Sequence, residues 1–175
     1  MENTYEFDTA SNDKLHVFQQ AAKILLDKTF KLIDLDAERP WGFFLSADEN
    51  QAQEFIKQFY SGIVLKDLDP SLPLRPKFLG IAPGKRLSWQ YHHRRSEIWR
   101  PIAGEFNLIT SDTDQETEPK VVRAGEVVSI PQGVRHRGIG LGGWALIAEI
   151  WQHTDSANPS DESDIVRVQD DFGRG

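Results

Sequence analysis

The stretch from Gly84 to Gly104 places three potential metal ligands inside a run with strand character. Gln90 and His92 are two positions apart, so on a β-strand their side chains point to the same face. A short basic turn follows, and Glu97 then opens a second apolar run that can return beside the first as a hairpin. Such a hairpin brings an amide, an imidazole and a carboxylate around one point. These donors suit a divalent metal ion of intermediate hardness.

A second stretch, from Gly125 to His136, combines a strand, a tight turn and a histidine. Together the two stretches resemble the two sequence motifs of the cupin superfamily. The first motif falls on Gly84, Gln90, His92, Glu97 and Gly104, and the second on Gly125, Pro131, Gly133 and His136, with Gly140 where cupins carry Asn. The resemblance implies that one divalent metal ion is bound by Gln90, His92, Glu97 and His136.

Gln90 is a departure from most cupins, which have a histidine at this position. The type II, single-cupin mannose-6-phosphate isomerases use the set Gln, His, Glu, His. Three further pieces resemble these isomerases: Arg39 to Gly42, the run from Pro83 to Gln90, and the tail from Asp164 to Arg174. The resemblance extends from about Arg39 to the C-terminus. It implies an aldose–ketose isomerase of phosphosugars, with mannose 6-phosphate and fructose 6-phosphate as the pair.

The order of patterns along the chain predicts a mainly β fold. Helical patterns occupy residues 13–28 and the segment that follows a capping sequence at residues 46–49, and a short strand is expected at 29–33. Short strands follow at 77–82, 86–92, 97–102, 105–110, 119–123, 126–130, 134–139, 144–152 and 165–169. We therefore expect a cupin double-stranded β-helix, a jelly-roll barrel, over residues 77–175. Residues 1–76 would form a helical and irregular extension packed on it, within one structural domain.

Composition narrows the classes of partner. The 175 residues are enough for one domain with a full core. A net charge of −7 argues against nucleic acid, so a phosphorylated substrate would need a local basic cluster. No apolar run reaches transmembrane length, no signal peptide is evident and there is no cysteine, so no membrane partner and a cytoplasmic location are expected. A homodimer is compatible with the resemblance, because many cupins dimerise.

Two basic residues are candidates for contact with the substrate. Lys77 lies on the strand before the first motif, and it is either an edge lysine or, as the resemblance implies, a substrate-facing residue. Arg95 lies two positions before Glu97, as an arginine does in the isomerases. It either belongs to a solvated turn or binds phosphate or an enediolate, since a guanidinium suits such oxygens.

Three more residues are candidates for the pocket wall and the catalytic base. Trp99 shares a strand face with Glu97, and Trp41 belongs to the isomerase-like segment. Either ring would serve as a sugar-binding wall or pack in the core, whereas Trp89, Trp144 and Trp151 are expected to be packing residues. Glu149 interrupts an apolar strand and either reaches solvent or lies inside the barrel. Inside, burial would raise its pKa and suit it to general base catalysis.

Three functions are compatible with this pattern. An isomerase is favoured because a neutral Gln90 leaves the ligand set with one negative charge, and the bound ion then acts as a Lewis acid. Zn²⁺ is the expected ion, with Mn²⁺, Fe²⁺, Co²⁺ or Ni²⁺ as alternatives. A metal-dependent oxygenase is a second possibility, weakened by Gln90 because redox iron sites carry more histidine or carboxylate. A sugar-binding cupin without activity is the third.

Overall fold

The computed structural model describes residues 5–69 and 71–174 of the chain. Its helices are α1 (Lys14–Asp27) and α2 (Ala52–Phe59), the latter preceded by a 3₁₀ turn at Glu49–Gln51. Its strands are β1 (Leu32–Asp36), β2 (Gly42–Ala47), β3 (Leu74–Ile81), β4 (Trp89–Tyr91), β5 (Arg95–Ala103), β6 (Glu105–Ser111), β7 (Lys120–Arg123), β8 (Val128–Ile130), β9 (Arg135–Gly140), β10 (Ala145–His153) and β11 (Val166–Gln169).

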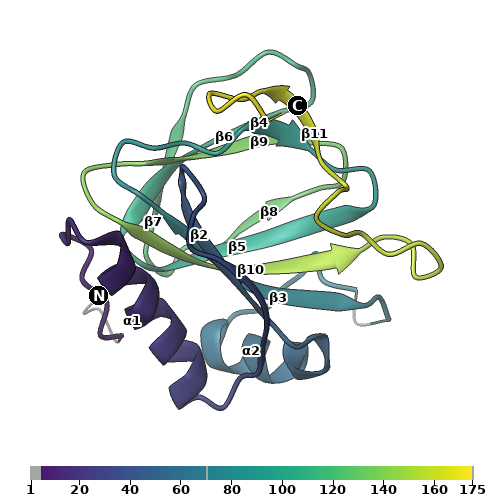
Figure 1. The fold of residues 1–175 in the computed structure, drawn as a ribbon. Helices are drawn as coiled ribbons and strands as arrows, with labels where there is room; N and C mark the ends of the chain where they lie inside the picture. The colour runs from purple at the N-terminus through teal and green to yellow at the C-terminus, as the bar shows by residue number, and fades with distance from the viewer. Residues whose placement is uncertain (1–4, 70, 175) are drawn as a thin grey trace.

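These strands form two antiparallel sheets that face each other, with the helices outside the larger one (Figure 1). The larger sheet has the order β1-β2-β3-β10-β5-β8, and the smaller sheet has the order β11-β4-β9-β6-β7. This arrangement is the double-sheet barrel of a cupin, and it confirms the fold class predicted from the sequence. None of the helices in the described ranges is long and apolar enough to cross a membrane.

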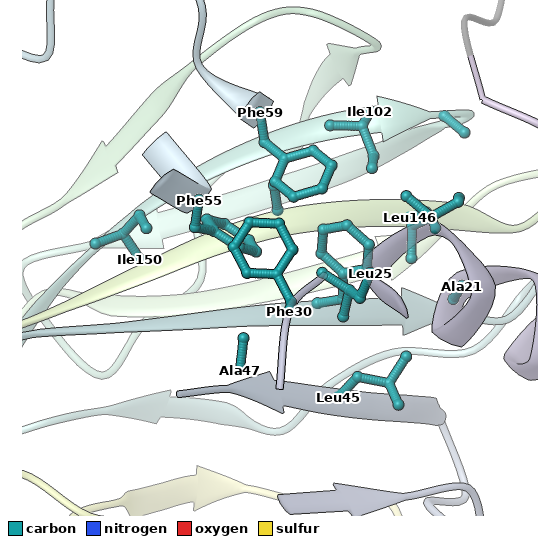
Figure 2. Packing of buried hydrophobic residues seen from close by; sticks show 14 of the residues in the cluster. Ala21, Leu25, Phe30, Leu45, Ala47, Phe55, Phe59, Ile102, Leu146 and Ile150 are labelled. Carbon is teal, nitrogen blue, oxygen red and sulfur yellow. The ribbon is translucent and has the colours of Figure 1, made fainter. Parts of the chain in front are cut away.

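Strand β10 shows how the larger sheet separates two hydrophobic clusters. Every residue of β10 is buried, because helices cover one face and the barrel interior covers the other. Leu146, Ala148 and Ile150 pack in the outer cluster with α1 and α2 (Figure 2). Ala145 and Ile147 pack in the inner cluster between the sheets. By strict alternation Glu149 and Trp151 continue the inner face.

The N-terminal region contributes strands as well as helices. Asp13 caps α1 by accepting a hydrogen bond from the His16 backbone N–H at 3.2 Å. The strand expected at 29–33 forms later, as β1, because the chain turns at Thr29, whose φ is 63°. Both β1 and β2 extend the larger sheet beside β3. Residues 1–76 therefore build part of the sheet in addition to the helical cover.

Residues 154–165, which we call the crossing loop, connect the larger sheet to the smaller one. The loop leaves the end of β10 and leads to β11, which pairs with β4 (Figure 1). Ser160 and Asp164 in this loop are buried although both are polar. Buried polar side chains need hydrogen-bond partners, and those of the crossing loop belong to the site described next.

Candidate active site

Three predicted metal ligands converge between the two sheets. His92 follows β4 and His136 lies on β9, both in the smaller sheet, whereas Glu97 lies on β5 in the larger sheet. All three are buried, and their ligand atoms lie within 4.8 Å of one another. His92 Nε2 is 3.2 Å from Glu97 Oε1, and His136 Nε2 is 3.3 Å from Glu97 Oε2.

The hydrogen bonds of the two histidines fix which ring nitrogen is available. His92 Nδ1 lies 2.6 Å from the carbonyl oxygen of Asp164, and His136 Nδ1 lies 3.0 Å from that of Val134. A carbonyl only accepts, so in both rings Nδ1 carries a hydrogen, and in the neutral form of each ring Nε2 offers a lone pair. His136 Nε2 is buried and has no hydrogen-bond partner among the described residues. The triad therefore fits a divalent metal ion, which would supply the missing partner.

Gln90 lies beside this triad on the interior face of the smaller sheet. It is directly opposite His136 in the pairing of β4 with β9, and it lines the same pocket as Glu97. Its Oε1 accepts a hydrogen bond from Ser88 Oγ, which orients the amide. Its role as a fourth ligand stays a prediction.

Arg95 contacts the triad through two guanidinium nitrogens and the crossing loop through the third. Nε donates to Glu97 Oε1 at 2.8 Å, and Nη2 lies 3.2 Å from His92 Nε2. Nη1 donates to Ser160 Oγ and to the Asp161 carbonyl of the crossing loop, each at 3.1 Å. Burial alone would raise the pKa of Glu97, but the histidines and Arg95 outweigh it and hold that pKa well below its usual range.

Trp151, expected from the sequence to be a packing residue, is buried and packs its ring against two cations of the site. The Arg95 guanidinium lies 3.5 Å from the centroid of the Trp151 ring, and Lys77 Nζ lies 4.6 Å from it. Trp151 lines the pocket because it shares the inner face of β10 with Glu149. A run of apolar residues does not reveal this, since both faces of β10 are buried.

Glu149 lies inside the barrel, with 2% of its surface exposed. Trp99 Nε1 donates to Glu149 Oε1 at 2.9 Å and also to Glu97 Oε2 at 3.1 Å, so one indole connects the two carboxyl groups. Burial, and then the negative charge of Glu97, raise the pKa of Glu149 to about 8. Glu149 Oε2 is buried without a hydrogen-bond partner in the described part of the chain, and Glu149 lines the pocket.

Lys77 also faces the interior, directly opposite Glu149 in the pairing of β3 with β10. Its Nζ lies 2.7 Å from Glu162 Oε1 of the crossing loop and 4.0 Å from the centroid of the Phe44 ring. Lys77 is therefore a buried cation inside the barrel and not an edge lysine.

One pocket gathers these groups. Of the residues predicted from the sequence, it is lined by Trp41, Lys77, Gln90, Arg95, Glu97, Trp99 and Glu149. His92 and His136 are not among its lining residues, but both contact Glu97. The pocket is also lined by residues that had no assigned role, including Arg39, Glu162, Arg167 and Arg174. The isomerase-like segments contain three of them, but a motif does not show which side chains turn inward.

Comparisons with known proteins agree with this architecture. The xanthan biosynthesis protein XanB of Xanthomonas campestris pv. campestris is 28% identical over 137 residues, which are 78% of this chain and 23% of that protein. The mannose-1-phosphate guanylyltransferase of Salmonella montevideo is 35% identical over 98 residues, 56% of this chain and 19% of that protein. The chain thus spans less than a quarter of the length of these relatives.

A solved structure supports the fold alone. Procruciferin, an 11S globulin from Brassica napus, has a TM-score of 0.51 at 13% identity, over 76% of this chain and 28% of that one. The family model described as the C-terminal part of mannose-6-phosphate isomerase matches residues 64–170, which is more than half of the chain and includes every candidate metal ligand. The chain therefore belongs to the mannose-6-phosphate isomerase C-terminal family within the cupin superfamily.

Proposed function

We propose that this chain is a metal-dependent aldose–ketose isomerase of a phosphosugar, with mannose 6-phosphate and fructose 6-phosphate as the pair. The observation that carries the proposal is Glu149, a buried carboxyl group with a pKa of about 8. Its Oε2 lacks a hydrogen-bond partner among the described residues, and it lines the same pocket as Glu97. A group of this kind suits proton transfer near neutral pH.

His92, Glu97 and His136 would hold one divalent ion, with Gln90 as the fourth ligand. Zn²⁺ suits these nitrogen and oxygen donors, and Mn²⁺, Fe²⁺, Co²⁺ and Ni²⁺ suit them as well. When bound, the ion would polarise the oxygens on C1 and C2 of the sugar. One carboxylate and three neutral ligands would leave the centre with a net positive charge.

The side chains of the pocket would carry the proton and stabilise charge. Glu149 would remove a proton from one of the two carbons and return it to the other, through a cis-enediol. Trp99 holds Glu149 Oε1 at 2.9 Å, which leaves Oε2 to face the sugar. Lys77 and Arg95 line the same pocket, and their positive charges would lower the energy of negative charge on the sugar oxygens.

The family and a relative both favour a phosphorylated mannose as the substrate. The description of the matching family names mannose-6-phosphate isomerase, and the Salmonella relative is named a mannose-1-phosphate guanylyltransferase. Trp41 and Trp99 would serve as apolar walls for the faces of the sugar ring, since both line the pocket.

The test is an isomerase assay on the purified chain loaded separately with Zn²⁺, Mn²⁺ and Co²⁺. We expect interconversion of the two phosphosugars that stops on chelation and returns with metal. In deuterated water, deuterium should appear at C2 of the sugar. Glu149→Gln should keep the metal and lower turnover by at least about a hundredfold, the lower range for a general base. Glu126→Gln, an exposed carboxylate outside the pocket, is the control and should keep full activity.

Three results would count against the proposal in different ways. Full activity of Glu149→Gln would remove Glu149 from the mechanism. No conversion and no deuterium exchange with any metal would leave a sugar-binding protein as the better explanation. Oxygen consumption that depends on bound iron would favour an oxygenase.

A further inference from the structure

Three arginines from distant parts of the sequence line the same pocket as the metal triad. Arg39 lies in the connector between β1 and β2, Arg167 on β11, and Arg174 in the C-terminal tail. Their charges act on one another, since those of Arg174 and Arg39 both contribute to lowering the pKa of Arg167, after burial. We call Arg39, Arg167 and Arg174 the arginine cluster.

Three positive charges placed close together repel one another and raise the free energy of the folded chain unless an anion binds between them. The pocket is lined by five cations (Arg39, Lys77, Arg95, Arg167 and Arg174) and only three acids (Glu97, Glu149 and Glu162). Asp36 and Asp170 pair with Arg39 and Arg174 but do not line the pocket, so only the groups that line it carry more positive than negative charge. This local balance occurs in a chain whose net charge is −7. A local positive field in an acidic protein points to an anionic ligand and not to a general affinity for polyanions.

Two members of the cluster are held in place by acids that occupy only part of each guanidinium. Arg39 Nε lies 3.0 Å from Asp36 Oδ2, and Arg174 contacts Asp170 through Nε at 3.1 Å and Nη2 at 2.6 Å. A guanidinium has five N–H donors, so such pairing orients the group and leaves donors for a ligand. Arg95 differs, because all three of its nitrogens already contact the triad and the crossing loop.

Strand pairing gives the backbone distance between Arg167 of the arginine cluster and His136 of the metal triad. Arg167 is directly opposite Gln90 across β11 and β4, and Gln90 is directly opposite His136 across β4 and β9. Directly paired residues point to the same face, and adjacent strands are about 4.8 Å apart. The backbone of Arg167 is therefore roughly 10 Å from that of His136, along one row of the inner face.

We propose that the arginine cluster is the subsite for the phosphate of the substrate, and that Arg95 instead positions Glu97 and His92. In a hexose 6-phosphate, four carbon atoms and the ester oxygen separate C2 from phosphorus. A substrate of that length places C1 and C2 at the metal triad and its phosphate at the cluster. Guanidinium groups bind phosphate oxygens through charge-assisted, often bidentate hydrogen bonds. This inference rests on the proposed function for the identity of the sugar.

The test measures binding separately from turnover. Isothermal titration of the metal-loaded chain with inorganic phosphate, mannose 6-phosphate and mannose gives the affinity of each. Arg39→Gln and Arg167→Gln should each weaken phosphate and mannose 6-phosphate binding at least about tenfold, as expected for loss of a charged hydrogen bond. Mannose binding and metal content should stay unchanged, and Arg167→Lys should restore part of the affinity.

Arg86→Gln is the matched control. Arg86 forms a bidentate pair with Asp171 of the same tail but does not line the pocket, so its loss should leave phosphate binding unchanged. Phosphate affinities within twofold of wild type in both Arg39→Gln and Arg167→Gln would overturn the subsite. If the wild-type chain binds phosphate through the cluster but isomerises no sugar, the subsite stands and the proposed function fails. If the chain isomerises the phosphosugars but the variants bind phosphate as tightly as the wild type, the proposed function stands and the subsite fails.

Discussion

At the scale of single residues, the decisive feature is that the pKa values of two carboxyl groups in one pocket are shifted in opposite directions. Glu97 is surrounded by His92, Arg95 and His136, which hold its pKa low despite its burial. Glu149 is equally buried, yet burial and the charge of Glu97 raise its pKa to about 8. Two acids separated in this way can take different roles, one as a permanent anion and one as a proton carrier.

The raised pKa of Glu149 predicts a specific dependence of stability on pH. Its folded-state pKa of about 8 exceeds the ordinary value of 4.5, so the folded chain keeps a proton that the unfolded chain releases. The stability linked to this proton is complete below about pH 4.5 and is lost as the pH rises through about 8. Glu149→Gln, which stays neutral, should therefore gain stability relative to the wild type by a few kcal/mol between pH 5 and pH 8.

Urea unfolding of both proteins at pH 5 and pH 8, with metal chelated, measures this difference. Because all other groups titrate in both proteins, the change with pH in the difference between their free energies of unfolding reports the titration of Glu149. A gap that is the same at both pH values would contradict the assigned environment of Glu149.

The histidines give a second prediction at this scale. His136→Ala should lower bound metal from one ion per chain to a small fraction, because the Nε2 that lacks a hydrogen-bond partner among the described residues is lost as a ligand. Elemental analysis after dialysis measures the metal content. His93→Ala is the control, since His93 is adjacent to His92 in sequence but its side chain is exposed. Equal metal in the His136 and His93 variants would argue against the site as described.

At the scale of elements, the crossing loop holds the residues of the candidate active site together. The Asp164 carboxylate accepts hydrogen bonds from the backbone N–H groups of His93 and Arg94, each at 3.0 Å, and from Ser160 Oγ at 2.7 Å. The carbonyl of Asp164 accepts from His92 Nδ1, and the loop also contacts Arg95 and Lys77. One loop thus fixes the orientation of a metal ligand and of two cations.

Asp164→Ala should therefore weaken metal binding although Asp164 does not contact the metal. We expect a loss of roughly 10–100-fold in metal affinity, the range for partners that orient a ligand. Competition with a chelator of known affinity measures it. Asp155→Ala is the control, because Asp155 also caps a backbone N–H of the crossing loop, that of Ala157, but is exposed. If both variants kept wild-type affinity, the loop would only be a connector.

At the scale of the whole molecule, the metal triad and the main helix-covered core lie on opposite faces of the larger sheet. The outer cluster packs α1 and α2 on that sheet (Figure 2). Within it the Phe78 ring contacts the rings of Phe55 and Phe59. The triad lies on the inner face, between the sheets. The fold therefore has a source of stability that does not depend on the metal.

Removal of the metal should lower the melting temperature without unfolding the chain at room temperature. A ligand that binds only the folded state at 100 times its Kd stabilises it by about 2.7 kcal/mol. For a chain of this size, that corresponds to a shift of roughly 5–10 °C. Calorimetry with and without chelator measures the shift, and circular dichroism at 25 °C checks that the strands persist. An unfolded spectrum in chelator would show that the core does not suffice.

The sequence by itself determined the strand positions from about residue 77 onward, and its resemblance to the cupin motifs implied the candidate metal ligands. The strand positions depend on local rules: residues two apart share a strand face, and glycine permits the tight turns that end several strands. Gln90 with His92, and Glu97 with Trp99, follow from that spacing alone.

Tertiary structure decided which face of each strand became the interior. Alternation in β10 groups Glu149 with Trp151, but it does not say whether that face meets solvent, helices or the opposite sheet, because both faces are buried. Tertiary structure also decided that Arg39, Arg167 and Arg174 meet at one pocket, since they come from segments that only sheet pairing and the C-terminal tail bring together. The chemistry of this pocket arises from contacts between distant segments, and the periodicity within one segment does not show which other segments it meets.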